Sequence, residues 1–109
     1  MKSNLVKLSE KGNWTEKDEV AFNAIIVNMI NQKKMFQDIG NKTELPVAFA
    51  IKNAQEYVLG LFSGITINLF ANYWIGEHES GLSSEDLLYL YHKIAMSHKE
   101  IISGLFDNV

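Results

Sequence analysis

The pattern of hydrophobic and polar positions is most unusual over residues 57–76, where twenty consecutive residues carry no charge. Because 3.6 residues complete a helical turn, positions four apart trace one slowly winding stripe along a helix. Residues 44–76 are therefore predicted to form one long central helix, kinked or straight, of roughly 50 Å. Charged, small or amide residues occupy the stripe: Glu44, Ala48, Lys52, Glu56, Gly60, Gly64, Asn68, Asn72 and Gly76.

Two alternatives compete with a single central helix. Ser63-Gly64 is a suitable turn between two shorter helices. Apolar and polar residues alternate along residues 65–70, and the segment is rich in β-branched side chains. Both features are compatible with a short strand. Each glycine inside a helix costs about 1 kcal/mol of helix stability, so Gly60 and Gly64 need an explanation if the segment is helical. Close approach of another backbone along that stripe would explain both.

A second helix is predicted over residues 15–38. Thr15 and Asp18 have the spacing of a capping box at its start. The central helix, in contrast, is predicted to start at Thr43, and its first turn tolerates Pro46. Residues 39–42 are predicted to be a C-cap and loop. The predicted core face of the helix over residues 15–38 consists of Phe22, Ile25, Ile26, Met29 and Phe36, with Val20, Ala24 and Val27 beside it.

A last helix is predicted over residues 83–106, with Ser83 and Asp86 at its start. Its expected core face is Leu87, Leu90, Tyr91, Ile94, Ile101 and Leu105. Residues 1–13 are expected to be an N-terminal arm whose Leu5, Val6 and Leu8 pack on the body. The whole chain, residues 1–109, is thus predicted to be a single all-α domain, a small three- to four-helix bundle around the central helix.

Composition narrows the function classes. The chain has 109 residues, enough to bury a real core, and no cysteine, so disulfides, thiolate zinc sites and thiol nucleophiles are excluded. All ten basic residues are lysine, and the pI is about 5.5, which argues against nucleic-acid binding. Lysine without arginine, together with many asparagines and isoleucines, is typical of an AT-rich genome such as that of a low-GC bacterium or its phage. We expect a cytoplasmic protein.

No catalytic motif is recognisable. His78 lies between Glu77 and Glu79 in a polar stretch that we expect to be a solvated loop. His92 and His98 are six positions apart, whereas helical metal pairs need three or four, and His98 is expected on the core face. Glu56 borders the apolar segment but has Lys52 four residues earlier. We expect no enzyme activity, no cofactor and no metal.

The apolar segment also has the length of a membrane-spanning helix, and the spacing of Gly60 and Gly64 is typical of membrane helix pairs. Lysine does not flank it immediately; Glu56 and Glu77 do. A membrane-associated or membrane-active protein using residues 57–76 is therefore an alternative to a helix buried by protein.

Trp74-Ile75-Gly76 resembles the Trp-x-Gly signature of WxG-type secreted proteins of about a hundred residues. In that family the signature turns a helical hairpin, so the resemblance implies a turn here and export from the cell. The motif is off-centre in this chain. The family's C-terminal Tyr-x-x-x-acid signal is also missing, since Ala95 follows Tyr91 at that spacing and Lys93 follows Tyr89.

The surplus of apolar surface for so few helices predicts a protein that works by binding protein. We expect a homo-oligomer formed through the central helix, and a protein partner in the manner of a bacterial or phage inhibitor or immunity-type accessory protein. The residues predicted to form the oligomer or partner interface are Gly60, Leu61, Phe62, Gly64, Asn68, Asn72 and Trp74.

Overall fold

The structure is a computed structural model that describes residues 13–42, 44 and 48–106. Five helices and no strand are present in those ranges: α2 (Glu16–Asn31), α3 (Lys33–Lys42), α5 (Ala54–His78), α6 (Ser84–Met96) and α7 (His98–Phe106). The all-α class is confirmed, with five helices in these ranges where three or four were predicted. The arm with Leu5, Val6 and Leu8, and the expected helix start at Thr43 and Pro46, lie outside the described residues.

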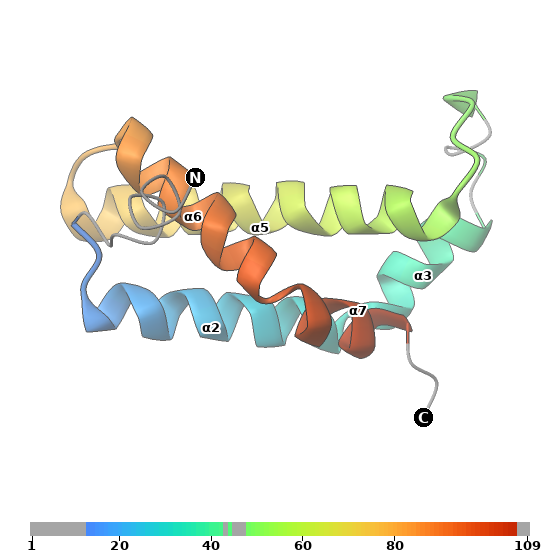
Figure 1. Ribbon diagram of the computed structural model, residues 1–109, viewed down its shortest axis with the longest axis horizontal. Coiled ribbons are helices and arrows are strands. Elements are labelled where there is room, and N and C mark those ends of the chain that lie inside the picture. Colours follow the sequence, from blue (N-terminus) through green and yellow to red (C-terminus); the bar gives the residue numbers. More distant parts are fainter. Residues whose placement is uncertain (1–12, 43, 45–47, 107–109) are drawn as a thin grey trace, which may run out of the picture.

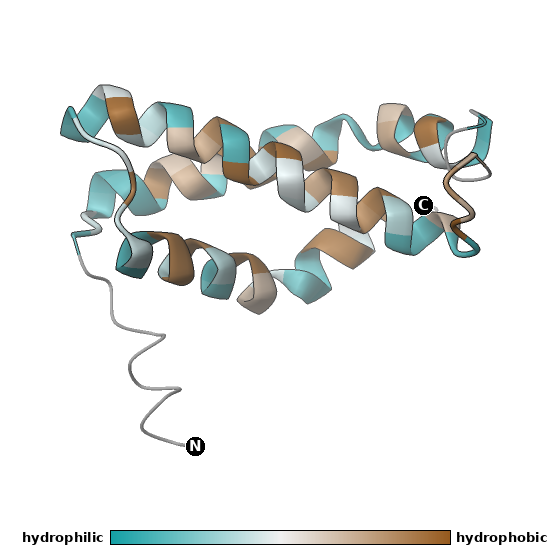
Figure 2. Ribbon diagram, turned by 90° about the horizontal axis from the view of Figure 1, so that it is seen from above, coloured by the Kyte–Doolittle hydropathy of each residue, from teal (hydrophilic) through white to brown (hydrophobic). Residues whose placement is uncertain are grey.

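Helices α2 and α5 lie side by side and run in opposite directions, and α3 connects to the far end of the pair (Figure 1). Helices α6 and α7 cross one side of this pair, as two perpendicular views show (Figure 1, Figure 2). Helix α5 is continuous through Ser63-Gly64, which excludes both a turn and a strand there. It begins ten residues later than predicted, at Ala54, where the Asn53 side chain accepts a hydrogen bond from the Glu56 N–H.

Two helices predicted as continuous are broken once each. The first is interrupted at Gln32, and α3 then extends through residues 39–42, which were expected to be a loop. The last is interrupted at Ser97, whose hydroxyl donates to the Lys93 carbonyl four residues earlier. Such back-bonding competes with the helical ladder and bends helices.

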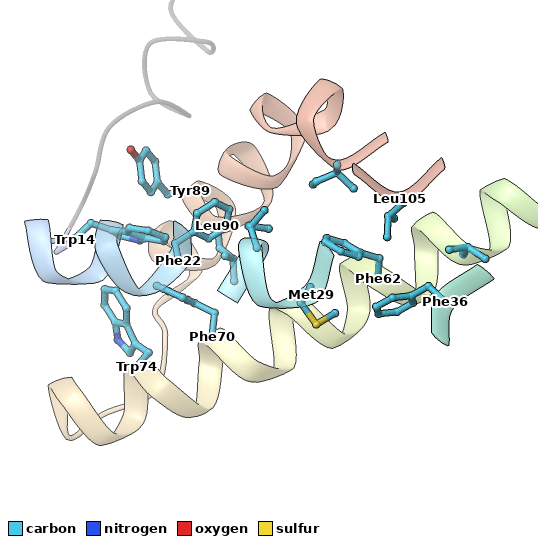
Figure 3. Close-up of a cluster of buried hydrophobic side chains, with 13 residues drawn as sticks. Trp14, Phe22, Met29, Phe36, Phe62, Phe70, Trp74, Tyr89, Leu90 and Leu105 are labelled. Atoms are coloured by element: carbon cyan, nitrogen blue, oxygen red, sulfur yellow. The ribbon is translucent and has the colours of Figure 1, made fainter. Parts of the chain in front are cut away.

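The core is a band of aromatic and aliphatic side chains between α5 and the other helices. At one end Trp14 stacks on Phe70 with ring centroids 4.7 Å apart, and at the other Phe36 contacts Phe62 at 5.5 Å (Figure 3). Most predicted core residues are confirmed, whereas Tyr91 is exposed and Tyr89 takes its place. Val20 and Val27, expected beside the core face, are also exposed. The buried hydrophobic residues are Trp14, Phe22, Ile26, Met29, Phe36, Val58, Phe62, Phe70, Trp74, Tyr89, Leu90, Ile101 and Leu105.

Close helix contacts depend on two glycines that the sequence did not single out for this role. A Cβ atom placed on Gly40 would lie 2.6 Å from Cγ2 of Val58, and one placed on Gly104 would lie 2.6 Å from Cγ2 of Ile30. These positions bring α3 against α5 and α7 against α2. Both neighbours are β-branched and have little rotamer freedom with which to move aside.

Replacing Gly40 with alanine should lower the free energy of unfolding by about 1–2 kcal/mol, because the clash with buried Val58 outweighs the gain in helix propensity. Gly81→Ala is the matched control, since no neighbouring group lies within 4 Å of its added Cβ and Gly81 is exposed outside the helices, so that stability should change by less than about 0.5 kcal/mol. Urea unfolding followed by circular dichroism measures both. Equal effects of the two substitutions would contradict the close α3–α5 contact.

Candidate functional site

The buried and exposed faces of α5 are two stripes with the same period of four. Every fourth residue from Val58 to Trp74 is buried against the bundle: Val58, Phe62, Thr66, Phe70 and Trp74. The residues two positions away from each of these are exposed: Gly60, Gly64, Asn68, Asn72 and Gly76. The small and amide stripe predicted from the sequence is therefore the outer face of α5.

The glycines of this outer stripe have open space beside them among the described residues. Apart from the backbone of α5 itself, no atom lies within 4 Å of a Cβ placed on Gly60, Gly64 or Gly76. The expected close approach of another backbone is thus absent among the described residues, and it takes place at Gly40 and Gly104 instead. Exposed glycines in the middle of a helix destabilise it by about 1 kcal/mol each, without a compensating contact in the single chain.

The predicted interface residues fall into two groups. Gly60, Gly64, Asn68 and Asn72 are exposed, and Leu61 is half-buried beside them. Phe62 and Trp74 are 0% and 2% exposed, so their side chains belong to the core and not to a surface. The sequence could not separate them from the interface residues, because nearly every residue around this helix is uncharged.

The bundle covers only part of this apolar helix. Within its most apolar 18-residue stretch, 28% of the residues are buried. Leu69 and Ile75 keep 43% and 52% of their surface exposed. Helix α5 is also long and apolar enough to cross a membrane by length and composition, a property it shares with core helices of soluble proteins.

A buried polar cluster joins the start of α2 to the end of α5. Asp18 is fully buried and accepts hydrogen bonds from the Thr15 backbone N–H at 2.9 Å and the Tyr73 hydroxyl at 2.7 Å. His78 Nε2 lies 2.9 Å from Asp18 Oδ2, and its ring stacks on Trp74 with centroids 3.8 Å apart. The capping box at Thr15 is confirmed, and its Asp18 carboxylate also holds a second helix.

His78 corrects an expectation. It was predicted to lie in a solvated loop, but it is the last residue of α5, and only 20% of its side chain is exposed. The acidic neighbours Glu77 and Glu79 led to the prediction that His78 is exposed to solvent. Its position is instead determined by the stacking on Trp74 and by the contact with the buried Asp18 carboxylate. Nothing in the local sequence links it to Asp18, sixty residues earlier. His98, expected on the core face, is exposed at the start of α7.

The electrostatics of the cluster favour an ionised carboxylate. Burial raises the pKa of Asp18, but the hydrogen bonds from Thr15, Tyr73 and His78, with the charge of His78, outweigh burial and hold that pKa below its ordinary value. Burial and the hydrogen bond to Asp18 raise the pKa of Tyr73, so its hydroxyl remains a donor. Because Thr15, Tyr73 and His78 all hold this one carboxylate, the cluster is a clamp between helices.

Two further ion pairs support the same end of the bundle. Lys93 Nζ of α6 lies 2.7 Å from Glu19 Oε2 of α2, and Lys17 lies 2.9 Å from Glu77. Among the described residues, no group of three histidine or carboxylate side chains could hold a metal ion. Glu56 is exposed in the first turn of α5.

The Trp74-Ile75-Gly76 signature lies inside α5 and does not turn the chain. Trp74 is buried, Gly76 is helical, and the helix ends two residues after it. The C-cap is Glu79, which adopts the left-handed conformation with φ 58° and donates its N–H to the Ile75 carbonyl. The central helix was predicted to end at Gly76, but it continues to His78.

Comparisons with protein-family models, curated proteins and solved structures found no match to this chain.

Replacing Asp18 with asparagine should lower the free energy of unfolding by about 2–4 kcal/mol, because the neutral amide keeps only one of the two acceptor oxygens that Thr15, Tyr73 and His78 share. Since the folded-state pKa of Asp18 is below the unfolded value of about 3.9, its stabilisation is present above pH 4 and is lost as pH falls through the folded-state pKa. The difference between wild type and variant should therefore shrink below about pH 4.

The matched control is Glu16→Gln, an exposed acid in the same helical turn, which should change stability by less than about 0.5 kcal/mol. Chemical denaturation between pH 3 and pH 7 makes the comparison. An equal wild-type-to-variant difference at both ends of that range would rule out the ionised clamp.

Proposed function

We propose that the protein acts without catalysis, by binding protein surfaces, and that it associates with itself through the outer face of α5. One observation carries this proposal: the outer face is long and uncharged, and no described residue covers its glycines. It extends over four helical turns from Gly60 to Gly76 without a charged residue. Exposure of this face to water adds nothing to the stability of a monomer, whereas a complex with a partner would be stabilised by burying the face.

The chemistry of the face suits a close helix contact. Glycines allow another backbone to approach, and Gly60 and Gly64 have open space where that backbone would lie. Asn68 and Asn72 each offer an amide donor and an amide acceptor, so they can satisfy one another across an interface. Leu61 and Leu69 flank the stripe and add apolar area that association would bury.

The biological role that fits these features is an accessory protein that binds and blocks a larger protein, as inhibitors and immunity-type proteins of bacteria and phages do. Small size and a lysine-only basic composition support this role. Ten large hydrophobic residues of the described part of the chain are exposed, nine of them on α2, α3, α5, α6 and α7 and the tenth Phe49. Surface therefore remains for a second partner.

A membrane-associated function is the second candidate, and the length and apolarity of α5 favour it. Insertion would require α5 to separate from the Asp18 clamp and from the aromatic core. The two candidates therefore differ in a simple property, because a binding module is soluble and helical without detergent.

Gly64→Leu should weaken self-association at least tenfold, because a bulky side chain would hold the partner backbone away from the stripe. Light scattering after size exclusion in detergent-free buffer measures the molar mass over a concentration series. We expect wild type at a discrete multiple of 12.4 kDa and the variant shifted toward monomer. Asn23→Leu, an equally bulky change on the exposed surface of α2, is the control.

Three outcomes would count against this proposal. Wild type that remains monomeric at all concentrations contradicts self-association. Assembly that survives Gly64→Leu unchanged removes the α5 stripe from the contact. Protein that is insoluble without detergent, but helical and stable in phospholipid vesicles, supports the membrane function instead.

A further inference from the structure

The outer face of α6 is apolar and exposed. Leu88, Tyr91 and Ala95 follow one another at intervals of three and four residues, so they lie on one side of the helix. Leu88 and Tyr91 each keep 52% of their surface exposed, and Ala95 is exposed as well. The buried residues of α6 lie on its opposite side, toward the bundle: Asp86, Tyr89 and Leu90.

At its far end this face leads into an apolar groove where α6 meets α7. The groove has an open volume of about 230 Å³, and Ala95 belongs to both the face and the groove. Its other lining residues are mostly aliphatic: Leu59, Ile94, Ile101 and Ile102, beside Ser63 and His98. The face and the groove together form one continuous apolar surface, the α6 strip.

We propose that the chain's own N-terminal arm occupies the α6 strip, with Leu5, Val6 and Leu8 packed against it. Residues 1–12 of the arm lie outside the described residues, which begin at Asn13. The Asn13 N–H donates to Asp86 Oδ1 at 3.2 Å, so the arm is attached beside the first turn of α6. The inference concerns α6 and does not depend on self-association through α5.

The length of the arm matches the strip. From Leu88 to Ala95 the helix rises about 10 Å, and an extended chain separates Leu5 from Leu8 by about the same distance. Leu8 is five residues and Leu5 eight residues before Asn13, so an extended arm places them up to about 17 Å and about 27 Å away from it. Leu8 can therefore reach the near end of the strip, and Leu5 can reach the groove.

The charge of the arm complements the surface around it. Residues 1–12 contain Lys2, Lys7 and Lys11 against the single Glu10, which gives a net charge of +2 without the terminal amine. The apolar side chains Leu5, Val6 and Leu8 lie between these lysines in the sequence. The arm is thus both apolar and basic.

The end of the bundle where α2 and α6 begin and α5 ends is acidic (Figure 1). Exposed Glu16, Glu79 and Glu85 lie there, and none of them forms an ion pair with a described residue. Farther along the strip, the adjacent Lys99 and Glu100 have opposite charges. The other charges at this end are matched in pairs: Lys17 with Glu77, Lys93 with Glu19 and His78 with Asp18. The lysines of the arm are therefore the cations that complement the three acids.

Attachment to the same chain favours the arm over a separate partner. A segment on a short flexible linker has an effective concentration on the order of millimolar at a site within its reach, so modest apolar contacts are sufficient. Val20 and Ile75 are also exposed at this end of the bundle, but each has an acid four residues away, Glu16 and Glu79. Neither offers an apolar strip comparable to that of α6.

A nitroxide spin label on the arm tests this docking in the full-length protein. The chain has no cysteine, so Ser3→Cys provides a single labelling site. Docking predicts that the backbone amide signals of Leu88, Tyr91 and Ala95 lose most of their intensity in NMR spectra. The signal of Met35, in α3 at the other end of the bundle, should be unaffected.

Two pairs of substitutions make the test specific. Leu5→Ser combined with Leu8→Ser removes apolar side chains from the arm and should restore most of the lost intensity, whereas Asn4→Ser, a polar change in the same arm, should not. Leu88→Asn should also release the arm, whereas Val27→Asn, at a 50% exposed position of α2, should not. Circular dichroism establishes that each variant is folded.

Three results would overturn this inference. Attenuation of the α6 signals that persists in the double serine variant shows only that a free arm passes near α6. Attenuation centred on Val20 or Ile75 places the arm on another surface. Equal attenuation in a mixture of spin-labelled chains and isotope-enriched chains without the label places the arm on a second copy. Self-association through α5 is tested separately by Gly64→Leu and stands or falls independently.

Discussion

The rest of the structure depends on covering one face of a 25-residue helix that has no charge over most of its length. Burial of a large apolar side chain is worth about 1.5–3 kcal/mol. Among the described residues, α5 contributes four of the thirteen buried hydrophobic side chains, more than any other helix. Its buried side chains from Val58 to Trp74 line up on one side because they recur every four residues. Helices α2, α3, α6 and α7 are arranged around that side, and the opposite side is left to glycine and asparagine.

Polar interactions determine how the ends of the helices meet. Asp18 is buried where α2 begins and α5 ends, so that the positive end of one helix dipole and the negative end of another lie together. The carboxylate favours the first and His78 favours the second. Apolar packing is non-directional, and this clamp supplies a specific register between α2 and α5.

The helical class, the N-caps at Thr15 and Ser83 and most of the core could be predicted from the sequence, because hydrophobic periodicity and caps are local signals. The breaks at Gln32 and Ser97 could not, since neither glycine nor proline marks them. The face of α5 was also ambiguous: with apolar residues all round, Phe62 was as good a surface candidate as Leu61. The contact between Asp18 and His78 is long-range, and no local pattern encodes it.

The central claim is that the outer face of α5 is covered in solution by a second copy. The most direct measurement is the relaxation of side-chain amide protons by a soluble paramagnetic probe, recorded by NMR at a concentration where association is complete. This claim predicts that Asn68 and Asn72 are protected, whereas Asn23, which is exposed on α2, is strongly relaxed. Equal relaxation of all three amides would contradict it.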